Sequence, residues 1–157
     1  MKVRFILLIL IFLFCLSSCK QNQVRGVIIE SDLYTTLDYK RNKELILLID
    51  KTLDKDQNAL AKLNKFWCGG GAGCYDLGFI FTQIIYQIGE EEFILMVDKL
   101  NPKQCAGING LISAGLEYGD NNNDGEMDDS EIKIEFPKLL AVLQFKNSKL
   151  TLSKSIE

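Results

Sequence analysis

Apolar residues in much of this chain recur every three or four positions, the spacing that places them along one face of an α-helix. The segment 43–53 shows this pattern, because its apolar residues share a face and its charged residues lie elsewhere. A second helix of the same kind is expected after Asp54, which can cap its first turn. The apolar positions of the two helices are Leu45, Ile46, Leu48, Ile49 and Leu53, then Ala59, Leu60, Leu63, Phe66 and Trp67.

The segment 75–88 is apolar on most sides, which predicts a helix at the centre of the fold, ended by Gly89. The glutamates at 90–92 favour a new helix N-terminus, because acidic side chains interact well with the positive end of the helix dipole. This fourth helix ends at the Asn101-Pro102 dipeptide, since proline cannot continue it. Its apolar positions are Phe93, Met96, Val97 and Leu100.

The segment 103–118 is expected to form a fifth helix despite its three glycines, which would permit close packing against a neighbour. They are Gly107, Gly110 and Gly115.

After an acidic loop, residues 132–136 alternate between apolar and polar like a strand, and Pro137 opens a last helix through Phe145. Strand and helix remain alternatives for 132–136. The predicted fold class is mainly α: a small bundle of about five or six short helices with an EF-hand-like loop near the C-terminus.

The acidic segment 120–131 carries the pattern of a calcium-binding loop. Side-chain oxygens alternate at its first, third and fifth positions, Gly125 stands at the sixth, where the turn is sharpest, and a glutamate closes the twelfth. The segment resembles an EF-hand loop, and the resemblance implies one bound calcium ion. It implies as ligands Asp120, Asn122, Asp124, the backbone carbonyl of Glu126, Asp128 directly or through water, and Glu131 with both carboxylate oxygens.

Asn, Asp and Gly are also turn formers, so an acidic turn without a ligand is the alternative interpretation. The chain carries only one such loop, whereas EF-hand loops usually pair, and Pro137 interrupts the helix that should follow it. These departures favour a structural ion over a calcium sensor, or pairing of the loop in a homodimer.

At the start of the chain, Lys2 and Arg4 precede the apolar run 5–16, which is too short to span a bilayer and is typical of a secretion signal. The run ends in Leu16-Ser17-Ser18-Cys19, which is similar to the lipobox of bacterial lipoproteins. That resemblance implies cleavage before Cys19 and acylation of its thiol, which would anchor the protein to the lipid bilayer. An ordinary cleaved signal is the alternative. Lys20 after the cysteine favours the outer membrane, if the cell has one.

The expected organisation is a removed signal peptide at 1–18, a lipidated cysteine and tether at 19–30, and one helical domain at 31–157. Composition narrows the function of this domain. The net charge of −3 and the scattered lysines and arginines argue against nucleic acid as a partner. The absence of histidine removes Ser-His and Cys-His dyads and most zinc sites, so no enzyme is expected. Asp76 and the glutamates at 90–92 are interpreted as a helix cap and a solvated first turn.

The remaining cysteines, Cys68, Cys74 and Cys105, are disulfide candidates in an oxidising envelope, and the sequence leaves their pairing open. Cys68 and Cys74 flank a glycine-rich stretch that is interpreted as a connector between helices; an anion cradle is the weaker alternative.

Together these features predict a lipid-anchored envelope protein that binds one structural calcium ion and acts as a binding or structural module. The alternative is an inhibitor or immunity-type lipoprotein that covers the active site of another envelope protein.

Overall fold

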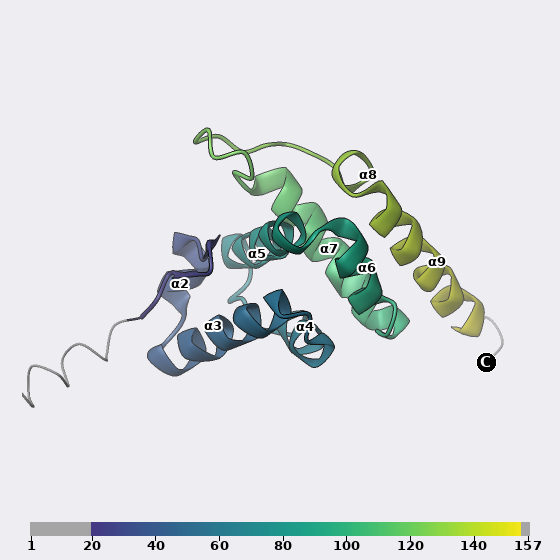
Figure 1. The fold of residues 1–157 in the computed structure, drawn as a ribbon, viewed down its shortest axis with the longest axis horizontal. Helices are drawn as coiled ribbons and strands as arrows, with labels where there is room; N and C mark the ends of the chain where they lie inside the picture. The colour runs from purple at the N-terminus through teal and green to yellow at the C-terminus, as the bar shows by residue number, and fades with distance from the viewer. Residues whose placement is uncertain (1–19, 155–157) are drawn as a thin grey trace, which may run out of the picture.

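The computed structural model describes residues 20–154, so the expected signal peptide and Cys19 lie outside the described residues. The described part is mainly α, as predicted, with eight helices and one two-stranded antiparallel hairpin (Figure 1). The elements are β1 (Gln23–Val24), β2 (Val27–Ile28), α2 (Ser31–Thr36), α3 (Tyr39–Leu53), α4 (Gln57–Leu63), α5 (Ala72–Ile88), α6 (Glu90–Val97), α7 (Pro102–Tyr118), α8 (Ile132–Glu135) and α9 (Pro137–Lys154).

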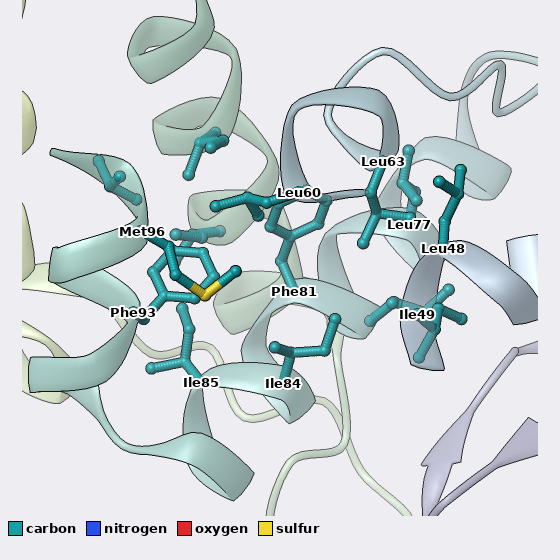
Figure 2. Packing of buried hydrophobic residues seen from close by; sticks show 14 of the residues in the cluster. Leu48, Ile49, Leu60, Leu63, Leu77, Phe81, Ile84, Ile85, Phe93 and Met96 are labelled. Carbon is teal, nitrogen blue, oxygen red and sulfur yellow. The ribbon is translucent and has the colours of Figure 1, made fainter. Parts of the chain in front are cut away.

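Helix α5 is the central helix, which confirms the interpretation of its apolar segment. It contacts α2, α3, α6 and α7, and most of its residues from Leu77 to Ile85 are buried. Figure 2 shows Phe81 at the middle of the core, between the side chains of α3 and α4 and those of α6. The rings of Phe81 and Phe93 meet edge to face with their centroids 6.5 Å apart, a favoured arrangement for aromatic pairs.

Helices α5 and α7 touch through their backbones where Gly78 faces Gly115. A Cβ atom on Gly115 would lie 2.6 Å from the amide nitrogen of Phe79 and closer still to the carbonyl of Gly78. Any side chain at either position would therefore force the helices apart. This confirms that a glycine in the 103–118 segment permits close packing. Gly110 does not contribute, because a Cβ atom added there would meet no other atom within 4 Å.

Several helix ends follow the local sequence. Asn101 and Gln104 form a reciprocal capping box at the start of α7, with Pro102 in the first turn. Gly89 ends α5 with φ +88°, a backbone conformation that only glycine adopts without strain. The cap expected at Asp54 was wrong: Asp56 caps α4 by accepting from the Asn58 amide at 2.8 Å, and α4 ends before Phe66 and Trp67.

The segment expected as a tether, 19–30, is packed onto the domain from Lys20 onward. Val27 and Ile29 are buried. Between them, the backbone of Ile28 makes two hydrogen bonds with the side-chain amide of Gln83 in α5. The Ile28 amide donates to Gln83 Oε1 at 2.8 Å, and Gln83 Nε2 donates to the Ile28 carbonyl at 3.0 Å. The domain therefore begins before residue 31, because these apolar side chains join the core.

The open choice at 132–136 is decided for helix. Ile132 and Phe136, four positions apart, are both buried, whereas Ile134 is 64% exposed, which is the helical rather than the strand pattern. Helix α9 then runs beside α6 in the same direction. Glu90 Oε1 accepts from the Leu139 amide at 2.9 Å, and Lys146 Nζ donates to the carbonyls of Val97 and Leu100 at 3.3 and 3.2 Å.

The contact between Gly78 and Gly115 predicts that Gly115→Ala lowers the free energy of unfolding by about 1–3 kcal/mol, as overpacking does in other cores. The matched control is Gly110→Ala on the same helix, where the methyl group meets open space and better helix propensity should raise stability by up to about 1 kcal/mol. Urea unfolding of both variants checks this. Equal effects of the two substitutions would contradict the close contact.

Candidate calcium-binding loop

The entering half of the 120–131 loop folds around the carboxylate of Asp120. Its Oδ1 accepts from the Asp124 amide at 2.9 Å and its Oδ2 accepts from the Gly125 amide at 3.0 Å. Asn122 Oδ1 accepts from the same Asp124 amide at 2.8 Å, and Asp124 Oδ1 accepts from the Glu126 amide at 2.9 Å. Gly125 has φ +90°, so the sharp turn falls at the expected glycine. Asp120 and Asn122 thus accept from one amide, and Asp124 accepts from an amide two residues further along the loop.

The exit half is arranged differently. Asp128 Oδ2 accepts from the Asn121 amide at 2.7 Å, which closes the loop across its base. Glu131 lies outside this arrangement, because its carboxylate pairs with Lys133 Nζ at 2.7 Å and is 61% exposed. Glu126 is exposed as well, and its expected contribution is its backbone carbonyl.

Asn121 attaches the loop to the α5/α7 contact. Its Nδ2 donates to the Gly115 carbonyl at 3.0 Å, and its Oδ1 accepts from the buried hydroxyl of Thr82 at 2.6 Å. The exit half also returns to α7: the Asp128 amide donates to Gly119 and the Ser130 amide to Leu116, both at 3.0 Å. The loop therefore caps carbonyls that the end of α7 would otherwise leave without partners.

Sequence reasoning missed Asn121 and Thr82. Asn121 stands at the second loop position, whose side chain is not a ligand in the EF-hand pattern, so the motif gives no signal for it. Thr82 gives a faint signal as a hydroxyl in a mostly apolar helix, because a buried hydroxyl requires a partner. Its partner, 39 positions away, cannot be found without the fold.

The donor set fits calcium in part. Asp120, Asn122 and Asp124 supply the hard oxygen atoms that calcium prefers, on one tight stretch of backbone. Glu131 does not fit as it stands, because its pair with Lys133 directs it elsewhere. Across residues 20–154, no three acidic, cysteine or histidine side chains are gathered closely enough to hold a metal ion.

A pocket of about 400 Å³ opens beside the loop and contains an acid that the motif did not indicate. Glu135 accepts there from the hydroxyl of Tyr86 at 2.9 Å and from that of Ser130 at 3.0 Å. Burial raises the pKa of Tyr86, and the hydrogen bond to Glu135 raises it further, so this hydroxyl keeps its proton. The pocket is lined by Tyr86, Asn121, Asn122, Asp128, Ser130 and Glu135.

Within residues 20–154, the three cysteines form one disulfide and leave one free thiol. Cys68 and Cys74 form a disulfide with their Cα atoms 4.9 Å apart, so the glycine-rich stretch is a closed connector between α4 and α5. Cys105 is buried with a free thiol, and burial raises its pKa, which disfavours the reactive thiolate.

The other acidic candidates contact backbone or lysines. Asp76 accepts from the Leu33 amide at 2.7 Å and so caps α2 rather than its own helix, whose N-cap is Gly71. Burial raises the pKa of this carboxyl. The expected solvated first turn of α6 is held to its neighbours: besides the contact of Glu90 with α9, Glu91 pairs with Lys138 and Glu92 with Lys55.

The attachment through Asn121 predicts that Thr82→Val lowers the free energy of unfolding by about 1–3 kcal/mol, because the amide oxygen of Asn121 loses its partner. The control is Thr52→Val, which removes an equally buried hydroxyl that donates only to a carbonyl of its own helix, that of Leu48. Hydrogen exchange at the Asp128 and Ser130 amides should accelerate in Thr82→Val alone. Unchanged exchange there would show that the loop does not depend on this bond.

Comparison of the chain with protein-family models, with curated proteins and with solved structures found no match. The functional argument therefore rests on the chemistry of the residues themselves.

Proposed function

We propose that this protein is a lipid-anchored envelope protein whose 120–131 loop holds one structural calcium ion. The observation that carries the calcium part is the Asp120 carboxylate, which receives the amides of Asp124 and Gly125 and so folds the entering half of the loop around one point. When bound, calcium would supply positive charge among these acidic side chains and fix their oxygens about one centre. Asp120, Asn122 and Asp124 would hold it, with Asp128 at the exit.

A structural role is favoured over a sensor because of what the loop is attached to. Asn121, Asp128 and Ser130 already bind the end of α7, so ordering of the loop would stiffen the junction between α7 and α8. The helix that follows the loop is a single turn, Ile132–Glu135, which ends at Phe136 before Pro137 begins α9. It is too short to act as a lever between two calcium-dependent states.

The anchor part of the proposal depends on Cys19, outside the described residues. Within the described residues, none of the helices combines the length and the apolar content that crossing a bilayer requires. Acyl chains on Cys19 would supply membrane attachment instead, at about 0.8 kcal/mol for each buried methylene group. The location in the envelope, with the outer membrane favoured where there is one, stays a prediction, as does the inhibitor alternative.

Calcium is expected to bind the mature protein with a Kd of about 10⁻⁴–10⁻³ M, as in extracellular calcium modules, and to bind more tightly than magnesium. At ten times the Kd, calcium should raise the free energy of unfolding by about 1.4 kcal/mol. Calorimetric titration and thermal melts with calcium or chelator measure both effects. An unchanged melting curve at millimolar calcium would contradict the proposal.

Two variants and a control refine this test. Asp120→Asn should abolish most of the calcium effect, because it removes charge from the carboxylate at the centre of the loop. Lys133→Gln frees Glu131 from its ion pair, so calcium affinity should rise if Glu131 is a ligand. The control, Asp129→Asn, removes the same charge from a loop position with no assigned ligand role. An equal loss in Asp129→Asn and Asp120→Asn would indicate general charge attraction rather than a site.

The anchor is tested by Cys19→Ser in the full chain. This variant should lose acyl labelling, because the acceptor thiol is gone. Cys15→Ser, in the apolar run of the signal, should remain labelled and serves as the control. Normal labelling of Cys19→Ser would rule the lipobox out.

A further inference from the structure

The protein has a basic aromatic surface where α3 and α4 meet the connector to α5. We define the basic aromatic surface as Arg41, Lys62, Lys65, Phe66 and Trp67, which line a hollow of about 330 Å³ together with one acid, Glu44. Trp67 is 53% exposed, and the Arg41 guanidinium lies over its ring at 4.4 Å from the centroid. Three cations beside one acid stand out in a chain whose net charge is −3.

The chain enters the domain at the same end of the molecule. Lys20 Nζ donates to the carbonyls of Tyr34 and Leu37 at 2.9 and 2.8 Å, at the end of α2. The next residue, Gln21, exchanges two hydrogen bonds with Asn42, which follows Arg41 in the chain. Lys20, the residue that directly follows the proposed anchor Cys19 in the chain, therefore lies at the end of α2 and close to the first turn of α3.

The connector that carries Trp67 lies against this end as well. A Cβ on Gly69 would be 3.5 Å from the side chain of Thr36, and Thr36 is adjacent to Leu37, which receives Lys20. Within the described part of the chain, the three cation–π pairs all gather here. They are Lys20 with Tyr34, Arg41 with Trp67, and Lys43 with Tyr39.

From this arrangement we infer that the basic aromatic surface docks onto anionic phospholipid headgroups beside the anchor. The inference rests on the proposed acylation of Cys19, which would hold this end at the bilayer. Lysine and arginine are attracted to anionic headgroups, and tryptophan is enriched where hydrocarbon meets water. Figure 1 shows the 120–131 loop and helices α3 and α4 on opposite sides of α5, so the loop is not part of the basic aromatic surface.

Trp67 is the only tryptophan of the chain, so its fluorescence reports on this surface alone. The acylated protein is reconstituted in vesicles of equimolar phosphatidylglycerol and phosphatidylcholine, and in vesicles of phosphatidylcholine alone. Emission should move to shorter wavelength in the anionic vesicles only, and lipids brominated near the headgroup should quench it. The shift should be lost at about 1 M salt, where the screening length falls to about 3 Å.

The charge reversal Lys62→Glu with Lys65→Glu should remove most of the shift while the protein still floats with vesicles. The matched control, Lys51→Glu with Lys99→Glu, changes the net charge equally at exposed lysines outside the basic aromatic surface and should keep the shift. A shift of equal size in neutral vesicles, or equal loss in the control variant, would overturn the inference.

These experiments distinguish a wrong assignment of the anchor from a wrong assignment of the docking surface. Flotation without any emission shift overturns the docking surface and leaves the anchor standing. An emission shift with anionic vesicles in Cys19→Ser supports the surface even if acylation is disproved. No flotation and no shift overturn both. A shift that depends on protein concentration rather than on lipid, with dimers in sedimentation, would assign the surface to a second copy and overturn the lipid assignment.

Discussion

The backbones of α5 and α7 touch where Gly78 faces Gly115, and the position of the 120–131 loop depends on this contact. Because no side chain separates the helices, Thr82 of α5 is close enough to reach Asn121, just beyond the end of α7. The carbonyl of Gly115 itself accepts from Asn121. The loop therefore caps the end of α7 at this helix crossing, and Asn121 joins it to the contact that packs the core.

Contacts between distant parts of the chain fix the remaining helices. Helices α6 and α9 cap each other, since Glu90 receives the Leu139 amide and Lys146 donates to the Val97 carbonyl. These hydrogen bonds give partners to backbone amides and carbonyls at helix ends that have none within their own helix. They therefore stabilise the fold more than exposed ion pairs, which typically contribute about 0–1 kcal/mol each. Hence α9 runs beside α6 in the same direction although α7, the 120–131 loop and α8 lie between them in the chain.

The acidic loop and the basic aromatic surface lie on opposite sides of α5 (Figure 1). The acidic loop lies over the end of α7, and the basic aromatic surface lies over α3 and α4 (Figure 1). This separation keeps the carboxylates of the loop away from Arg41, Lys62 and Lys65, so neither group neutralises the other. The pocket beside the loop and the hollow of the basic aromatic surface share no lining residue.

The sequence by itself determined the helical class, the apolar helix at the centre, the glycine at its end and the turn at Gly125, because the pattern of neighbouring residues carries each of them. Tertiary structure decided the rest. The strands of the hairpin before α2 are too short to show the alternation of apolar and polar residues that marks a strand. The hairpin is held in place by its hydrogen bond to Gln83 and by packing against the core. Glu131 matches the motif, yet its partner is Lys133. The partner of Cys68, the exposure of Trp67 and the bond from Thr82 to Asn121 also required the fold, since each depends on which surfaces the packed helices bring together.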